Sequence, residues 1–335
     1  MCKPDNSTIA MNTTNGGGVI IEDMKKMDDE QPTYKWVKVW LKIFYSIPPM
    51  VVPIINLSYS FSFVTALFLL ASRNIGEYIM VNTFDWPGPG DEDYEATMWG
   101  RGSVSSIVHS TLLCIGLVIA FRTQKYSPSA HLSIAPQWWQ DFVDSLLQFC
   151  TGYMIYDGIF NIILLRWDYG DLYPRRINFD DCLFLAHHLI TSWYMSSTRI
   201  IKAGHMSAMA CMFLGELSNP IHNMYMMSEH AQTVSCCNGP VGQAMHYWIE
   251  VAFAFTYNFL RVVVGPVAMI HLSYDVALSK QGRTNIPLGL RITWTAMVWI
   301  VIIGSMPWIT KCNTVIFSFL HDMNILSKDD TSAEL

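Results

Sequence analysis

The chain has 335 residues, of which 51% are hydrophobic and only 14% are charged, and its net charge is −6. Soluble domains carry about 25% charged residues, whereas the charges here gather between long apolar runs. The composition therefore excludes an ordinary soluble domain and indicates a membrane protein with several spans. The sequence has no basic stripe and no run of Lys and Arg, which excludes nucleic acid as a partner and leaves membrane lipid as the expected one.

The chain begins with a polar tail and a short amphipathic segment. Residues 1–32 are polar and are predicted to form a disordered N-terminal tail. Within 33–48, Trp36 and Trp40 fall on one side and three lysines on another. This pattern predicts a helix that lies at the membrane interface, and a plain basic flank before the first span is the alternative.

The remaining apolar runs predict an all-α fold, a polytopic transmembrane helical bundle of about seven spans (six to eight) over residues 49–320. An acidic stretch at 76–101 is too polar to enter lipid and is predicted to be a loop. Residues 315–320 are too few to cross and are expected to extend or cap the last helix, and 321–335 form a polar C-terminal tail. The predicted spans lie near residues 50–72, 103–121, 142–165, 181–198, 206–227, 246–272 and 288–309.

The distribution of basic residues predicts the orientation. Lysine and arginine are more frequent on the side of the predicted bundle that carries the N-terminus, which favours a cytoplasmic N-terminus. An odd number of spans then places the C-terminus on the opposite side. The sequons at Asn6 and Asn12 would not be glycosylated in that orientation.

Polar residues interrupt four neighbouring spans at helical spacing. A helix turns about 100° per residue, so residues four or seven apart share a face. Ionisable groups are costly in lipid and face the bundle interior or a water-filled cavity, which makes these stripes candidates for a functional site. The stripes consist of Tyr153, Asp157 and Asn161; Asp180 and Asp181 with His187 and His188; Glu216, Pro220 and Asn223; and Glu250, Tyr257 and Arg261.

The vicinal histidines carry the chemistry that the sequence favours. A histidine acts as a general base or as a nucleophile, and a carboxylate such as Asp157, Asp180 or Glu216 would fix its tautomer and stabilise the imidazolium. Arg261 would bind a phosphate or carboxylate head group, or else pair with one of these acids and hold helices together. Pro220 should kink the fifth span, because its ring displaces the carbonyl of Glu216. The predicted catalytic residues are His187, His188, Asp157 and Glu216, and the predicted substrate-binding residues are His109, Tyr153, Asn223, Tyr257 and Arg261.

A metal centre is not predicted. Neighbouring residues on a helix point about 100° apart, so one ion rarely binds both members of a vicinal pair. Phe184 stands where an HxxHH box needs its third histidine, and the sequence has no HxxxH motif, which excludes a di-iron hydroxylase or desaturase. A single zinc ion held by His109, one histidine of the pair and an acid is the alternative. No tightly bound cofactor is expected.

Five motifs follow one another between residues 100 and 281: SVSSIVHS, GYMIYDGIF, HHLITSWY, GELSNPIHN and YNFLRVVVGP. In this order and spacing they resemble the TLC-domain family, which includes ceramide synthases and translocon-associated membrane proteins. The resemblance implies an endoplasmic-reticulum membrane protein of lipid metabolism or homeostasis. In ceramide synthases the histidine pair is required to join an acyl group from acyl-CoA to a sphingoid amine. By analogy, His187 and His188 would be catalytic and acyl-CoA would be a co-substrate.

The chain departs from the ceramide-synthase pattern after the histidines. Those enzymes carry a second His-Asp…Asp…Glu cluster, where this chain reads MACMFLGELSNP with Glu216 as the acid. The chain therefore looks closer to the general TLC-domain branch. Three hypotheses follow: a lipid N- or O-acyltransferase, a non-enzymatic lipid-binding or lipid-sensing protein, and a translocon- or cargo-associated factor. The sequence leaves enzymatic turnover and the oligomeric state open.

Overall fold

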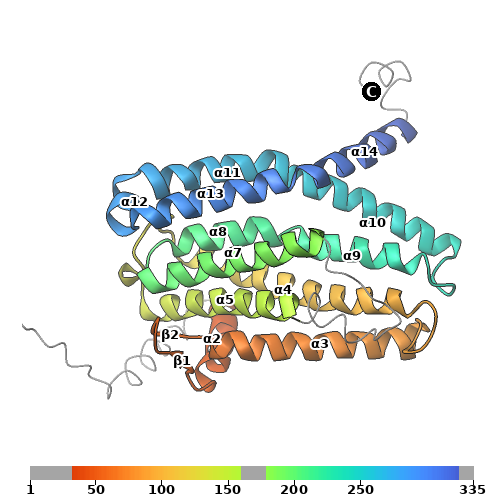
Figure 1. The fold of residues 1–335 in the computed structure, drawn as a ribbon, viewed down its shortest axis with the longest axis horizontal. Coiled ribbons are helices and arrows are strands. Elements are labelled where there is room, and N and C mark those ends of the chain that lie inside the picture. The colour runs from red at the N-terminus through yellow and green to blue at the C-terminus, as the bar shows by residue number, and fades with distance from the viewer. Residues whose placement is uncertain (1–31, 160–178, 324–335) are drawn as a thin grey trace, which may run out of the picture.

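The structure is a computed structural model that describes residues 32–159 and 179–323, which form a bundle of long helices lying side by side (Figure 1). The predicted all-α class is confirmed, since the strands within these ranges are two residues long. The predicted N-terminal tail up to residue 31, Asn161, the side chains of Asp180 and Asp181, and most of the predicted C-terminal tail lie outside the described residues.

Helices make up nearly all of the described chain. The long helix that starts at Pro240 contains two π-helical stretches, η5 and η6, and π-helical turns frequently mark functional sites. The helical elements are α2 Pro32–Ser46, α3 Ser60–Phe84, α4 Tyr94–Thr123, η2 Leu132–Ile134, α5 Gln137–Tyr156, α7 Phe179–Ile201, α8 His205–Glu216, α9 Asn219–Ala231, α10 Pro240–Asn258, η5 Phe259–Val264, α11 Gly265–Ser273, η6 Tyr274–Leu278, α12 Lys280–Asn285, α13 Leu288–Gly304 and α14 Met306–Asp322.

Helix α2 covers the predicted interfacial segment and packs on α5. Val37 and Leu41 are fully buried in the core, and the Trp40 Nε1–H donates to Ser145 Oγ at 2.7 Å. Trp36, one residue before Val37, is 72% exposed. An anchored helix with an exposed tryptophan suits a membrane interface, which stays a prediction here.

A short hairpin replaces the predicted start of the first span. Its strands, β1 (Val51–Val52) and β2 (Leu57–Ser58), pair antiparallel. Asn56 in the turn has a φ of 49°, in the left-handed region that asparagine tolerates better than most residues. Helix α3 therefore begins at Ser60 instead of near residue 50, and Ile54 at the hairpin tip is 94% exposed.

The predicted loop at 76–101 is wrong, because α3 continues to Phe84 and α4 already starts at Tyr94. Glu77 on α3 accepts a hydrogen bond from Arg101 Nη1 on α4 at 2.5 Å, and another from the Tyr94 hydroxyl. This pairing satisfies the charged groups between the two helices. Both helices can therefore extend beyond the apolar runs that defined the predicted spans.

Four continuous helices in the described part of the chain are long and apolar enough to cross a membrane. They cover residues 60–84, 94–123, 240–278 and 288–322, and the last one includes 315–320, which extend the final helix. Helices α5, α7, α8 and α9 lie in the same bundle without meeting that requirement (Figure 1). The arrangement is that of an integral membrane protein, and the count of seven spans stays a prediction.

The core has a larger part, a smaller part and a third small cluster around Met80 and Trp86, and the chain passes from the larger to the smaller part at the end of α8. The larger part lies around α3, α4 and α5, with Trp139 and Leu146 of α5 among its fully buried side chains, and it includes Met209 of α8. The smaller part joins α9, α10 and α14 around Tyr225 and Phe253. Helix α8 thus contributes to the larger part, whereas α9 contributes Tyr225 to the smaller part and also packs along α4, so the break lies where the chain passes from one part to the other.

Candidate functional site

A helix break positions the acid of the candidate site. Glu216 is the last residue of α8, a turn follows, and Pro220 is the second residue of α9. Because proline has no N–H, it cannot donate to the Glu216 carbonyl, so the predicted kink is a complete interruption. Asn219 Nδ2 donates to Glu216 Oε2 at 2.8 Å, and the Gly215 carbonyl accepts a hydrogen bond from Arg261 Nη2 of η5 at 3.3 Å.

His188 is held between two acceptors. Its Nε2 lies 2.7 Å from Asp157 Oδ2, at the end of α5, and its Nδ1 lies 2.5 Å from the Phe184 carbonyl one turn earlier in α7. A carboxylate and a carbonyl both accept hydrogen bonds, so the imidazolium form, with a proton on each nitrogen, satisfies both contacts. His188 therefore has no lone pair directed at a substrate in this arrangement.

His109 of α4 is enclosed between two aromatic rings. It is stacked on Tyr153 with ring centroids 4.0 Å apart, and on Phe149 with centroids 5.2 Å apart, and it is fully buried. Neither ring nitrogen has a hydrogen bond to any residue that the structure describes. Nδ1 lies 3.7 Å from Glu216 Oε2, so the two groups are close without being bonded.

Ser106 of α4 connects two predicted substrate-binding residues. Its hydroxyl lies 3.0 Å from the Tyr153 hydroxyl and accepts a hydrogen bond from Asn223 Nδ2 at 2.9 Å. Asn223 also donates to the carbonyl of Asn219, whose amide group holds Glu216. A continuous polar layer thus runs from α5 through α4 to the start of α9.

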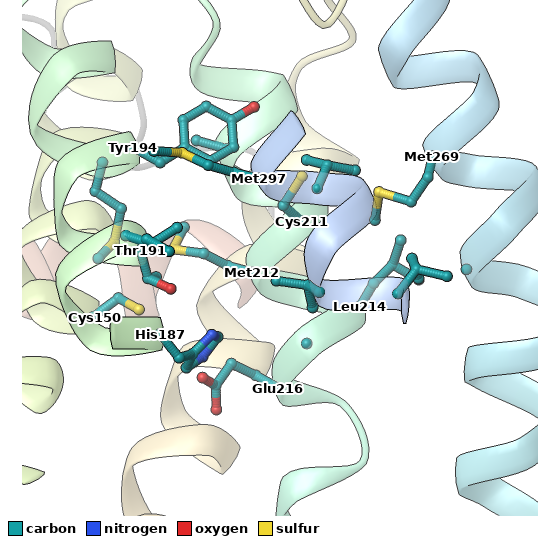
Figure 2. A pocket seen from close by; sticks show the side chains of 18 of the residues that line it. Cys150, His187, Thr191, Tyr194, Cys211, Met212, Leu214, Glu216, Met269 and Met297 are labelled. Atoms are coloured by element: carbon teal, nitrogen blue, oxygen red, sulfur yellow. The ribbon is translucent and has the colours of Figure 1, made fainter. Parts of the chain in front are cut away.

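A cavity of about 170 Å³ adjoins this layer (Figure 2). Figure 2 shows His187 and Glu216 next to one another at one end and Tyr194 toward the other. Arg261 also lines the cavity, and its bond to Gly215 places it beside Glu216. The wall is otherwise mostly apolar, and five methionines contribute to it: Met154, Met195, Met212, Met269 and Met297.

Comparison with known families supports the reading of the motifs. The family model of the TLC domain matches residues 101–313, which is more than half of the chain. The chain belongs to the TLC-domain family. The matched region runs from α4 into α14 and contains every predicted site residue of this TLC domain. No curated protein and no solved structure matches the chain.

The TLC domain brings the predicted catalytic residues together as two neighbouring pairs. Asp157 is bonded to His188, and His187 faces Glu216 across the end of the cavity (Figure 2). The rings of the two histidines are nearly perpendicular, at 88°, with centroids 5.8 Å apart. The vicinal pair therefore serves two environments: His188 binds α5, and His187 lines the cavity.

The predicted substrate-binding residues divide between the cavity and its surroundings. Arg261 lines the cavity, whereas His109, Tyr153 and Asn223 lie in the adjoining polar layer. Tyr257 is buried in the smaller core, where the Arg261 guanidinium lies over its ring at 5.4 Å. No carboxylate among the described residues lies within ion-pair distance of Arg261, so the expected pair with Asp157 or Glu216 is not formed.

Two polar side chains that connect residues of the candidate site are absent from the predicted site residues. Ser106 joins Tyr153 to Asn223, and Asn219 binds Glu216. Their spacing in the sequence could have identified them, because Ser106 stands one turn before His109 and Asn219 stands three residues after Glu216. Within the described ranges, no three His, Cys, Asp or Glu side chains converge closely enough to hold a metal ion.

Proposed function

We propose that this TLC-domain protein binds the acyl chain of a membrane lipid in the cavity between α7, α8 and α13. The observation that carries the proposal is the composition of the cavity lining, which is apolar along most of the cavity and polar at the end where His187 and Glu216 lie. Methionine side chains are flexible and adapt to an irregular apolar ligand. At the polar end of the cavity, His187, Glu216 and Arg261 would contact the polar group of the lipid. We also propose a role in lipid homeostasis at the endoplasmic reticulum, which rests on membership of the TLC-domain family and not on the cavity.

A photoreactive fatty acid with a diazirine on its chain tests the binding site in membranes that contain the full-length protein. We expect cross-links on peptides of α7, α8 and α13. A Met212→Trp substitution should abolish them, because the larger ring occupies the cavity. Met245→Trp, at an exposed position of α10, is the matched control and should label like the wild type. Cross-links that survive Met212→Trp would place the acyl chain elsewhere.

One observation favours turnover as a second candidate function, namely that His187 reaches the cavity beside Glu216 (Figure 2). In an acyl transfer from acyl-CoA, His187 would accept the proton of an attacking amine or hydroxyl of a lipid. A carbon–nitrogen or carbon–oxygen bond then forms, the thioester carbon–sulfur bond breaks, and the coenzyme A thiolate takes the proton. Glu216 would stabilise the imidazolium, and His188 with Asp157 would position α7.

Acyl-chain lipidomics separates turnover from binding. Cells without their own ceramide synthases would express the wild type, His187→Ala or His188→Ala at equal abundance. A transferase predicts a lipid class that rises with the wild type and is lost with His187→Ala. An unchanged lipid profile, together with photolabelling of the cavity, would leave acyl-chain binding as the function and remove the transferase.

A further inference from the structure

A second cavity, of about 390 Å³, lies where α2 and the hairpin meet the start of α5 and the end of α7. It is separate from the methionine-lined cavity and shares none of its lining residues. Its wall combines apolar side chains such as Phe61 and Ile47 with two acids, Asp141 and Asp144, and with the cationic side chains of Arg199 and Lys202. A cavity lined by both acidic and basic side chains is a candidate binding site for a ligand.

The acids of this second cavity are already bonded. Asp144 accepts hydrogen bonds from Arg199 Nε at 2.6 Å and from Gln148 Nε2 at 2.7 Å. Asp141 accepts from the Tyr45 hydroxyl at 2.5 Å and from Gln137. Burial and then the bond to Asp141 raise the pKa of the Tyr45 hydroxyl, so tyrosine stays the donor. Each carboxylate still has lone pairs for a further donor.

Three buried side chains that line the second cavity have polar atoms without hydrogen bonds to described residues. Arg199, His205 and Gln148 are 4%, 3% and 1% exposed. Arg199 Nη1, both ring nitrogens of His205 and Gln148 Oε1 have no hydrogen-bond partner in the described part of the chain. Buried polar atoms in native proteins are nearly always bonded, so several such atoms around one cavity indicate a molecule that bonds them. Lys202 is exposed at the same place and adds a second cation.

We infer that the second cavity binds the headgroup of a zwitterionic phospholipid. Its phosphate would accept hydrogen bonds from exposed Lys202 and, once a side-chain shift brings their buried nitrogen atoms to the cavity surface, from Arg199 Nη1 and His205. Its ammonium group would lie at Asp141 and Asp144. Two acids and two cations leave the cavity without net charge, which disfavours a ligand that brings an unbalanced charge.

The surroundings of the second cavity explain why the ligand is a lipid. Trp36 of α2 and Ile54 of the hairpin expose apolar side chains on the elements that form its outer wall. Ile47 and Leu57 contribute apolar side chains to the cavity wall near these elements. The acyl chains of a bound phospholipid can therefore leave along an apolar path into the surrounding bilayer. This site goes beyond the proposed function, since it needs no residue of the methionine-lined cavity.

Native mass spectrometry of the full-length protein in detergent tests the inference with three dioleoyl lipids. Phosphatidylethanolamine should bind at least about tenfold more tightly than diacylglycerol, which lacks the headgroup. Phosphatidic acid, which has the phosphate without the ammonium, should bind more weakly than phosphatidylethanolamine. Equal binding of phosphatidylethanolamine and diacylglycerol would overturn the site. Phosphatidic acid binding as tightly as phosphatidylethanolamine would overturn the zwitterionic headgroup.

Variants locate the binding. The double substitution Lys202→Gln and His205→Gln removes two phosphate donors without removing a hydrogen bond between described residues, and should weaken phosphatidylethanolamine binding about tenfold. Lys125→Gln, at an exposed lysine after α4, is the matched control and should bind like the wild type. Wild-type affinity in the double variant would refute the inference, and Lys202→Gln alone serves if the double variant does not fold.

Discussion

The two neighbouring histidines show how one residue step separates two roles. His188 bonds Asp157 and the Phe184 carbonyl, so it ties α7 to the end of α5. His187 has no hydrogen bond within the described chain and lines the cavity beside Glu216. Since successive residues of a helix point about 100° apart, one side chain can be structural while the next stays available for a ligand.

Single substitutions of the two histidines should therefore affect stability very differently. His188→Ala removes the bond between the imidazole and Asp157 and should lower the free energy of unfolding by about 2–3 kcal/mol. His187→Ala should change it by less than about 0.5 kcal/mol, because the side chain only contacts a cavity. Thermal unfolding of both variants in the same detergent measures the difference. Equal destabilisation would show that His187 also has a structural bond.

His109 is expected to lower the unfolding free energy, because its buried ring nitrogens have no hydrogen bonds to described residues. His109→Phe keeps the stack on Tyr153 and Phe149 and removes two buried ring nitrogens without hydrogen bonds, so the unfolding free energy should rise by about 1 kcal/mol. His109→Ala should instead lower it by about 2–4 kcal/mol, because a cavity remains. Thermal unfolding together with photoreactive fatty-acid labelling checks both. A stabilised variant that labels normally would mean that acyl-chain binding does not depend on His109.

At the scale of the helices, close approach of α3 and α5 depends on one glycine. A Cβ at Gly152 would lie 2.7 Å from the Cβ of Thr65 and even closer to the Ser62 carbonyl of α3. Real Cβ atoms do not approach this closely, so a side chain here must separate the two helices. Since α5 also ends at Asp157, the separation would reach the His188 pair.

Gly152→Ala should accordingly cost about 2–3 kcal/mol of unfolding free energy through overpacking. Gly289→Ala is the matched control, because no atom lies within 4 Å of the added methyl at the start of α13. That substitution should be neutral or slightly stabilising, since alanine favours helix more than glycine does. Thermal melts of both proteins decide, and a wild-type melting temperature for Gly152→Ala would mean that α3 can move away without loss.

At the scale of the whole molecule, the number of times that the chain crosses the membrane decides its topology. Four helices qualify as spans by length and apolarity, whereas α5, α7, α8 and α9 lie in the same bundle without qualifying, and α8 and α9 are only 12 and 13 residues long. Helices packed inside a bundle need fewer apolar residues than helices surrounded by lipid, because their polar groups face protein. Seven crossings with a cytoplasmic N-terminus remain our prediction.

Glycosylation tests that topology directly. Asn6 and Asn12 should stay unmodified, whereas an acceptor sequon in a flexible tag added after Leu335 should be glycosylated, because an odd count places the ends on opposite sides. A mobility shift that is reversed by endoglycosidase reports each modification. Modification of both ends or of neither would indicate an even number of crossings.

The sequence was informative about what the helices contain and less so about where they end. Apolar runs and polar stripes located the helices that carry Asp157, His188 and Glu216, because periodicity is a local property. The extension of α3 past residue 76 depends on Arg101, which lies 24 residues from its partner Glu77. The start of α3 depends on a hairpin of only two-residue strands, which has too few residues to form a recognisable pattern.

The candidate site divides in the same way. Spacing predicted that His187 and His188 point in different directions, but only the packing of α7 against α5 decides which one meets Asp157. Serine and asparagine are common in helices of polytopic proteins, so Ser106 and Asn219 became recognisable only once their partners were in place. A contact across helices cannot be predicted from either helix alone.

The break between α8 and α9 has a consequence for mutational scanning. Part of the polarity beside the cavity belongs to the main chain, since Arg261 is held by the carbonyl of Gly215. Replacing side chains leaves that oxygen in place, so an alanine scan would underestimate how strongly this end of the cavity attracts a cation or a hydrogen-bond donor. A binding contact made by a backbone carbonyl also tolerates side-chain substitutions at the residues around it, provided that Pro220 keeps the helix interrupted.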